Sequence, residues 1–486
     1  MDRRIHFRAF RNAASVCGLG TLMFAGAAHA SVTISSDTTQ NMSCANGVCA
    51  PTATDAVLNV GDLENLLAAA SVEVTTTGSG VQADNIVVDA PFAWSTASAL
   101  SLDAERSIEI EQPVSVQALS ALALTTNGGS TRGRGTLSFG TKGNVAFANL
   151  SSSLTINGAA YTLVNTVKAL GAAVSNNPSG DYAFASSYDA KQDGTYDSSP
   201  IIEIEGIVDG LGNVISNLSI SDLTTTGAAP FGTVSASGTL ADIRLERVVV
   251  RTREDAAGLV GTNQGTIESC SVTGKVRGGR LGTIGGLVSD NFGSIGLASS
   301  SASVSQGKTA GDSALGGLVG LNDGGSVSNS FATGPVSGGN GIGYFGGLAG
   351  ENYDASSAIS NSYASGSVSA GYASGPGAIE VGGLIAGNAG KVGSSYSTGS
   401  ATAGNNNDSY VGGFIGANGD SVTNGYWDTT TSGTDTGVGY GDSTGVTGLT
   451  TEQLQSGLPT GFDPKVWAEK PKLNGGLPYL VANPPP

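Results

Sequence analysis

The repeat that decides the fold is clearest between residues 317 and 334. It opens with Gly317-Leu318-Val319-Gly320 and closes with Val327-Ser328-Asn329-Ser330-Phe331-Ala332-Thr333-Gly334. The apolar pieces are three to five residues long and are bounded by Gly, Ser, Asn and Thr, which is typical of short strands joined by tight turns. A helix of ordinary length has no room within one such unit.

Six copies of the opening piece follow one another at spacings of 28, 31, 30, 36 and 30 residues. A second piece like 327–334 comes about nine to twelve residues after most of them, most clearly at 267–274, 359–366 and 392–399. This period predicts one coil of a parallel β-helix, because a propeller blade is longer and a leucine-rich repeat needs a leucine ladder. The anchor glycines of the six copies are Gly258, Gly286, Gly317, Gly347, Gly383 and Gly413.

Stacked coils lie about 4.8 Å apart, so equivalent side chains of successive repeats form columns. The apolar anchor residues are predicted to stack inside the solenoid. The glycines are predicted at corners that need a positive φ, or where neighbouring coils approach closely. A further column is predicted from one residue per repeat, and we expect a core or flanking ladder rather than a sugar-binding platform. Its members are Cys270, Phe331, Tyr363, Tyr396 and Tyr426.

The first half of the chain shows the same architecture more weakly. Apolar residues at period two form pairs between polar, glycine-rich stretches, which predicts many short strands. Two helices are predicted as insertions, one over 63–69 capped by Asp62 and one over 161–174 with a single apolar face. The pairs are Leu100/Leu102, Ile108/Ile110, Val114/Val116, Leu122/Leu124, Leu137/Phe139, Val145/Phe147 and Leu154/Ile156.

A cap is predicted near the C-terminus. Thr450 and Gln453 have the spacing of a helix capping box. We expect this segment to seal the C-terminal edge of the solenoid, because an open edge invites aggregation. The apolar residues of the predicted cap are Trp467, Leu477, Tyr479 and Leu480.

The first 30 residues are typical of a secretory signal peptide. Four arginines precede an apolar run over 13–28, and Ala28-His29-Ala30 predicts cleavage after Ala30. A membrane anchor is the alternative interpretation. Cleavage changes the net charge from −17 to −20 and removes His6 and His29, the two histidines of the chain. So acidic a protein is a poor match for nucleic acid.

Without histidine, the commonest general base and metal ligand are absent, so Ser–His and Cys–His catalysis are excluded for the exported chain. We expect no catalytic residue, no cofactor and no metal site. Three cysteines remain. Cys44 and Cys49 predict a small disulfide loop in an oxidising compartment, with two reduced thiols as the alternative. Cys270 is expected to be a small buried apolar residue.

The anchors, followed by Asn-Ser-Tyr/Phe-Ala-Ser/Thr-Gly, resemble the GLUG repeat of bacterial surface proteins. The segments 161–165, 180–185 and 207–220, which come before the repeats, are similar to parts of filamentous-haemagglutinin-like adhesins. The resemblance covers about residues 150–480, and more loosely 31–150, and implies a right-handed parallel β-helix that is exported and serves adhesion.

The resemblance also implies a division of the chain and a setting. The expected partner is a host-cell, glycan or matrix surface, with an outer-membrane two-partner-type transporter for export from a Gram-negative cell. The predicted regions are a signal peptide (1–30), a haemagglutinin-like N-terminal solenoid (31–160), a β-helix with a helical insertion (161–240), the GLUG-type β-helix (241–430) and a cap with a Pro-rich tail (431–486).

Two other functions fit the same scaffold. One is a polysaccharide lyase or glycoside hydrolase, which needs clustered carboxylates; the other is a biofilm or surface-layer structural protein. Residues 189–194 loosely resemble a calcium loop but lack its closing Glu. Within the repeats, Glu268, Asp323, Glu351 and Asp354 fall at unmatched positions, so we favour a non-catalytic adhesin. The candidate acids before the repeats are Asp189, Asp193, Asp197, Glu203, Glu205 and Asp209.

Overall fold

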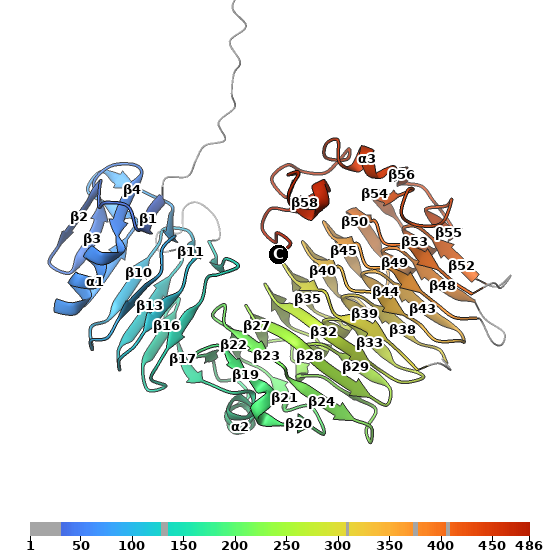
Figure 1. The fold of residues 1–486 in the computed structure, drawn as a ribbon, viewed down its shortest axis with the longest axis horizontal. Coiled ribbons are helices and arrows are strands. Elements are labelled where there is room, and N and C mark those ends of the chain that lie inside the picture. Colours follow the sequence, from blue (N-terminus) through green and yellow to red (C-terminus); the bar gives the residue numbers. More distant parts are fainter. Residues whose placement is uncertain (1–30, 128–134, 308–310, 373–377, 405–408) are drawn as a thin grey trace, which may run out of the picture.

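The computed structural model describes residues 31–127, 135–307, 311–372, 378–404 and 409–486. Within them, nearly all regular structure consists of short strands that pair in parallel with the coils before and after. Figure 1 shows these coils following one another along a curved axis. The prediction of an all-β parallel solenoid with few helices is confirmed.

The N-terminal coils have three faces, and every predicted period-two pair lies in one of their strands. The first face contains β4 (Ala56–Asn59), β1 (Ser31–Ser35), β8 (Asn85–Val88), β11 (Ile108–Ile110) and β14 (Leu137–Phe139). The second contains β9 (Phe92–Trp94), β12 (Val114–Val116) and β15 (Val145–Phe147). The third contains β3 (Val48–Pro51), β5 (Val72–Thr75), β10 (Leu100–Asp103), β13 (Ala121–Thr125) and β16 (Ser153–Ile156).

The N-terminal end is covered. The strand β2 (Met42–Ala45) pairs antiparallel with β3, and α1 (Val60–Ala69) packs beside β9. A small hairpin of β6 (Thr77–Gly78) and β7 (Val81–Gln82) follows. The predicted cap of α1 was wrong: Asn59, not Asp62, accepts hydrogen bonds from the first free N–H groups, those of Gly61 and Asp62. The helix begins three residues earlier than predicted because Asn59 can cap it at the end of β4.

An irregular coil joins the two halves. It contains β17 (Ala159–Val164), α2 (Val167–Asn176), β18 (Tyr182–Phe184), β19 (Tyr188–Asp189), a 3-10 turn (Ala190–Asp193) and β20 (Thr195–Tyr196). The helix predicted over 161–174 was half wrong. Residues 159–164 pair with β16 and β18 as a strand, and α2 starts only after Thr166, whose side chain caps it.

The repeat coils also have three faces. The first, called the inner sheet here, contains β25 (Gly227–Ala228), β29 (Asp255–Ala257), β33 (Thr283–Gly285), β38 (Ala314–Gly316), β43 (Gly343–Gly346), β48 (Ile379–Gly382) and β52 (Ser409–Gly412). The second, called the middle sheet, contains β21 (Ile201–Ile204), β26 (Phe231–Val234), β30 (Val260–Asn263), β34 (Val288–Asn291), β39 (Val319–Asn322), β44 (Ala349–Asn352), β49 (Ile385–Asn388), β53 (Ile415–Asn418) and β55 (Val438–Gly441).

The third face carries three rows of strands. The first row is β22 (Ile207–Asp209), β27 (Thr239–Ala241), β31 (Thr266–Glu268), β35 (Ser294–Gly296), β40 (Ser326–Ser328) and β45 (Ala358–Ser360). The next is β23 (Val214–Ser216), β28 (Arg244–Thr252), β32 (Ser271–Arg277), β36 (Ser299–Ser300), β41 (Phe331–Ala332), β46 (Tyr363–Ala364), β50 (Lys391–Ser397), β54 (Val422–Asp428) and β56 (Val446–Leu449). The last is β24 (Ser219–Asp222), β37 (Ser303–Ser305), β42 (Val336–Ser337), β47 (Val368–Ser369) and β51 (Ala401–Thr402).

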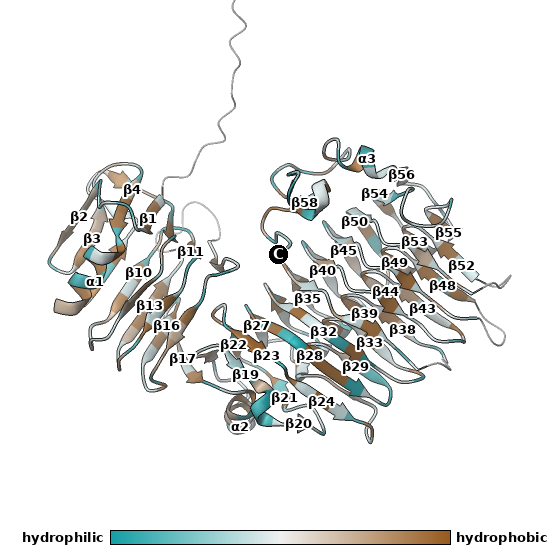
Figure 2. Ribbon diagram, in the orientation of Figure 1, coloured by the Kyte–Doolittle hydropathy of each residue, from teal (hydrophilic) through white to brown (hydrophobic). Residues whose placement is uncertain are grey.

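The interior is built from columns of equivalent buried side chains. Figure 2 shows that apolar residues recur on neighbouring strands. A polar column of asparagines lies among them. Six buried asparagines, each five residues after an anchor glycine, pass a hydrogen bond from side-chain Nδ2 to side-chain Oδ1 over 2.7–2.8 Å from coil to coil. They are Asn263, Asn291, Asn322, Asn352, Asn388 and Asn418.

The anchor glycines lie at close approaches, not at corners of positive φ. A Cβ on Gly317 would lie 2.1 Å from the carbonyl oxygen of Gly347, and Gly286, Gly347 and Gly383 meet the next coil in the same way. Positive φ occurs in the repeats at residues such as Asn329, with φ 49°, and at other glycines such as Gly324, with φ 72°. The prediction of close approaches therefore holds for the anchor glycines, and the prediction of positive-φ corners holds only for other glycines of the repeats.

The predicted mixed column was wrong in one member. Phe331, Tyr363, Tyr396 and Tyr426 are in register on neighbouring strands. The residue in register before Phe331 is Ser299, so Cys270 stands outside this column and its thiol is buried in the main core.

The C-terminal segment also departs from the prediction. The capping box of Thr450 and Gln453 is confirmed in α3 (Thr451–Leu454). Beyond it, β57 (Trp467–Ala468), a 3-10 turn (Asn474–Gly476) and β58 (Tyr479–Leu480) pack sideways against the aromatic column rather than over the end strands. Figure 1 shows this segment running back beside the coils. The aromatic side chains lie outside the main core and therefore need a cover.

Candidate functional site

Along the outside of the repeat coils, outward-facing residues of the inner and middle sheets contact one another where the two sheets meet, and a cavity opens at one end of this seam; we call the seam the outer groove. Outward residues of the inner sheet form one wall: Asp255, Thr283, Ala314, Tyr344, Glu380 and Tyr410. Outward residues of the middle sheet form the other: Thr262, Asp290, Leu321, Glu351, Gly387, Ala417 and Tyr440. Between them lie small residues, Gly261, Ser289, Gly320, Gly350, Ala386 and Gly416.

The two walls face each other closely. At the end near the C-terminus, the rings of Tyr410 and Tyr440 stack with centroids 4.7 Å apart. In the middle, a Cβ on Gly387 would lie 3.1 Å from both the Glu380 carboxylate and the Tyr344 ring. Glycine at position 387 therefore leaves room for these two side chains in the groove.

The other end of the groove is hollowed. A cavity of about 170 Å³ is lined there by residues of both sheets, including Asp255, Thr262 and Asp290. The Thr283 N–H donates to the Asp255 carboxylate over 2.8 Å, and the Ser289 hydroxyl lies 2.9 Å from the Asp290 carboxylate. Asp255 is thus held by a residue of the adjoining strand β33, and Asp290 by its neighbour on its own strand β34.

The carboxylates of the groove are crowded and half-buried, and their pKa values are raised. Burial, with the nearby Asp255 and Asp323, raises the pKa of Asp290 to about 6. Burial raises the pKa of Glu351 and Glu380 to about 7, with Asp312 adding to the first and Glu351 to the second. Burial and these acids raise the pKa of Tyr344 to about 12. The groove thus offers hydrogen-bond acceptors and aromatic rings, with no cation among its wall residues.

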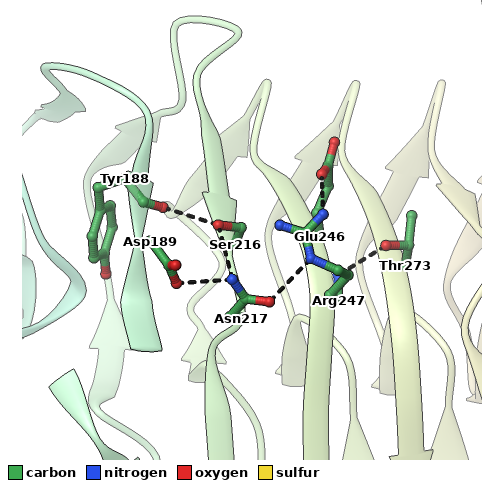
Figure 3. A network of polar contacts seen from close by, with 7 residues as sticks. All are labelled: Tyr188, Asp189, Ser216, Asn217, Glu246, Arg247 and Thr273. Carbon is green, nitrogen blue, oxygen red and sulfur yellow. Dashed lines mark hydrogen bonds and ion pairs between the residues drawn. The ribbon is translucent and has the colours of Figure 1, made fainter. Parts of the chain in front are cut away.

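The acids singled out before the repeats do not come together. As Figure 3 shows, Asp189 accepts from Asn217 Nδ2 over 2.8 Å, and Arg247 Nε donates to Asn217 Oδ1 over 3.0 Å. This network continues to Glu246 and Thr273 across exposed corners of successive coils. It is a structural brace between coils.

In the loop at 189–194, the carboxylates of Asp189 and Asp193 accept hydrogen bonds from different partners. Asp189 caps the 3-10 turn, whereas Asp193 accepts from the hydroxyls of Tyr188 and Tyr196 at 3.3 and 2.7 Å. Across the part of the chain that the structure describes, no group of three or more His, Cys, Asp or Glu side chains is arranged to hold a metal ion.

The other acids are equally dispersed. Glu205 accepts from Ser179, while Glu203 and Asp197 lie at the surface. Asp209 is 5% exposed, and burial raises its pKa to about 7; Asp242, which is also buried, lies close to it. These last two are too deeply buried to meet a polymer.

The remaining predicted site residues have structural roles. Cys44 and Cys49 face each other on β2 and β3 and are bonded. Cys270 is buried, and burial raises the pKa of its thiol. The predicted cleavage site after Ala30 and the signal peptide lie outside the described residues.

Sequence reasoning missed the outer groove. It treated Glu351 as unmatched, yet Asp290 and Glu351 both stand four residues after an anchor glycine. Asp255, Tyr344, Glu380 and Tyr410 stand three residues before one. These two fixed offsets are the signal that would have predicted both walls.

The repeated walls, rather than one compact cluster, define the class of protein: a repeat β-solenoid with an extended outer surface. The GLUG motif matches the chain at 253–277, 311–337 and 341–369, so the solenoid carries GLUG repeats. A stretch of 89 residues is 35% identical to part of halomucin from Haloquadratum walsbyi, which is 18% of this chain and 1% of halomucin. The chain therefore matches only a small fraction of that relative's length. No solved structure matches the chain significantly.

Among the described helices, none is long and apolar enough to span a bilayer.

Proposed function

We propose that this chain is an exported surface protein that attaches its cell to host cells, matrix or other bacteria without catalysis, through the outer groove. The observation that carries the proposal is the repetition of the groove walls over at least six coils. A repeat surface binds an extended ligand through many weak contacts, whereas catalysis needs one compact cluster. The GLUG repeats and the halomucin match support a surface role.

The proposal includes the export route. The basic and apolar first 30 residues act as a secretory signal cleaved after Ala30. An outer-membrane transporter of the two-partner type in a Gram-negative cell then releases or displays the chain. The bond between Cys44 and Cys49 supports passage through an oxidising compartment.

A glycan is the favoured ligand class within this proposal. Tyrosine rings cover the apolar faces of sugars, and carboxylates accept hydrogen bonds from hydroxyl groups. The negative groove repels polyanions, which argues against uronate polymers. A panel of immobilised glycans, matrix proteins and whole cells, probed with residues 31–486, tests the proposal. We expect one of these surfaces to retain the protein with no release of sugar. If none of them retains the protein, the proposal is contradicted.

A hydrolase is the second candidate, because Glu351 and Glu380 lie close together with raised pKa values. Glycoside hydrolases use a pair of carboxylates of which one stays protonated near neutral pH. The same panel separates the two functions: release of reducing ends that disappears in Glu351→Gln or Glu380→Gln favours the enzyme.

A further inference from the structure

The C-terminal segment 459–483, called the strap here, covers a ladder of stacked aromatic rings. Phe331 and Tyr363 have ring centroids 4.8 Å apart, and Tyr363 and Tyr396 5.1 Å apart, each pair within 9° of parallel. Phe462 and Trp467 of the strap lie over these rings. The ladder and its cover form an apolar cluster separate from the two larger cores.

The strap is not part of the hydrogen-bonded framework of the coils. Among the described residues, its backbone N–H groups bond only within the strap, as in the pairing of β57 with β58. Side chains make the polar contacts to the coils: Tyr396 donates to the Pro478 carbonyl over 2.6 Å, and Tyr426 to the Thr460 carbonyl over 2.7 Å. The strap can therefore leave without breaking a sheet.

The contact between the strap and the ladder leaves several buried polar atoms without hydrogen-bond partners. The hydroxyl of Tyr363 and the indole N–H of Trp467 are fully buried without a hydrogen-bond partner, and one carboxylate oxygen of Glu469 is also buried unpaired. Each such group costs free energy in the closed state that water restores on opening. Just before the strap, Gly457 has φ 143° and open space around it, which suits a hinge.

We propose that the strap is exchanged between two copies of this chain, which pair tail to tail. Without the strap, the aromatic ladder would be exposed to water. The strap of a second copy has the same sequence, so it can make the same contacts with the ladder. Charge favours the same partner, because the strap carries Lys465, Lys470 and Lys472 against Asp463 and Glu469, while the whole chain has a net charge of −17.

The place where the strap leaves the solenoid agrees with this pairing. The strap leaves the solenoid after α3, next to the last coil, whose strands β55 and β56 are largely exposed. The other end of the solenoid is covered by α1 and the disulfide hairpin. Two copies therefore meet through their C-terminal ends, and the dimer doubles the number of outer grooves, which raises avidity for a surface.

The test uses residues 31–486 with two added cysteines. The Asn483 side chain donates to the Asn329 main-chain carbonyl over 3.0 Å, so Asn329→Cys and Asn483→Cys place one cysteine on each side of this contact and leave the ladder residues unchanged. Light scattering across a concentration series is expected to give an average mass that rises from the monomer toward the dimer as the concentration increases. On oxidation, the double variant is expected to run as a covalent dimer, and chains with one cysteine each, once mixed, are expected to form a heterodimer.

The control mixes Asn329→Cys with a cysteine at the exposed Ser151, far along the solenoid from the strap. A monomer mass at every concentration overturns the proposal whatever the cross-linking shows. A dimer mass with cross-links confined to single chains overturns it as well, because the straps then stay on their own solenoid.

Discussion

At the scale of the residue, the repeats are held by a few recurring positions. Anchor glycines let neighbouring coils touch, asparagines hydrogen-bond to one another through the core, and the positive-φ corner is occupied by asparagine or serine in most repeats and by Leu297 in one. The sequence predicted which glycines recur but not why. Their role became clear only from the coil that lies against them, which sequence spacing does not reveal.

Substitution of Gly317 by alanine is expected to destabilise the protein by about 2 kcal/mol, because its Cβ would overlap the Gly347 carbonyl oxygen of the next coil. Urea unfolding measures the change. Gly393→Ala is the matched control, since nothing lies within 4 Å of a Cβ there. Equal stabilities of the two variants would contradict the close-approach explanation.

Substitution of Asn322 by leucine interrupts the asparagine column. Asn322 accepts from Asn291 over 2.7 Å and donates to Asn352 over 2.8 Å, so both neighbours lose a buried partner. The expected loss is about 3 kcal/mol of unfolding free energy. The exposed Asn176, whose amide donates to the Ala172 carbonyl of its own helix, provides the control, and the free energy of unfolding of its leucine variant is expected to lie within about 0.5 kcal/mol of wild type. An Asn322→Leu protein of wild-type stability would refute the role of the column.

At the scale of the element, short strands were easy to predict and their neighbours were not. Every period-two pair of the first half became a strand, because alternation reports which face is buried. Residues 161–164 looked helical by the same reasoning, but pairing with β16 and β18 makes them a strand. The outer groove was missed because it forms where two sheets meet. The angle between the two sheets cannot be predicted from the sequence of either strand alone.

The crowded carboxylates of the groove predict a pH dependence. Burial raises the pKa of Glu351 and Glu380 from 4.5 to about 7, so the folded chain binds more protons than the unfolded chain between these values. The free energy of unfolding therefore falls as pH rises from about 4.5 to 7. The Glu351→Gln/Glu380→Gln variant is expected to lose part of this fall, on the order of 1 kcal/mol at pH 8, and to match wild type at pH 4.

Urea unfolding at the two pH values measures this difference. The exposed Glu452 outside the groove provides the control through Glu452→Gln. Parallel pH profiles of wild type and the double variant would show that the groove acids are not the cause.

At the scale of the whole molecule, repeat spacing and composition were enough to predict a stacked parallel solenoid. They were not enough to place the C-terminal segment, which covers the aromatic ladder instead of the end strands. The apolar residues of a segment indicate that it packs against the rest of the protein, but they do not indicate which surface it covers. The stack of coils in Figure 1 repeats the strands of the inner and middle sheets, and the outward residues of these strands are the basis of the proposed attachment.

The most direct measurement compares the binding of residues 31–486 and of a Tyr410→Ala/Tyr440→Ala variant to the surface that retains wild type. Tyr440 is 61% exposed and its ring stacks on Tyr410 at the surface of the last coil, so the fold is expected to survive. Tyr372→Ala, at an exposed tyrosine outside the groove walls, is the control. The account predicts that the groove variant binds at least tenfold more weakly, about 1.4 kcal/mol, while the control binds like wild type. Equal binding by all three proteins would contradict attachment through the outer groove.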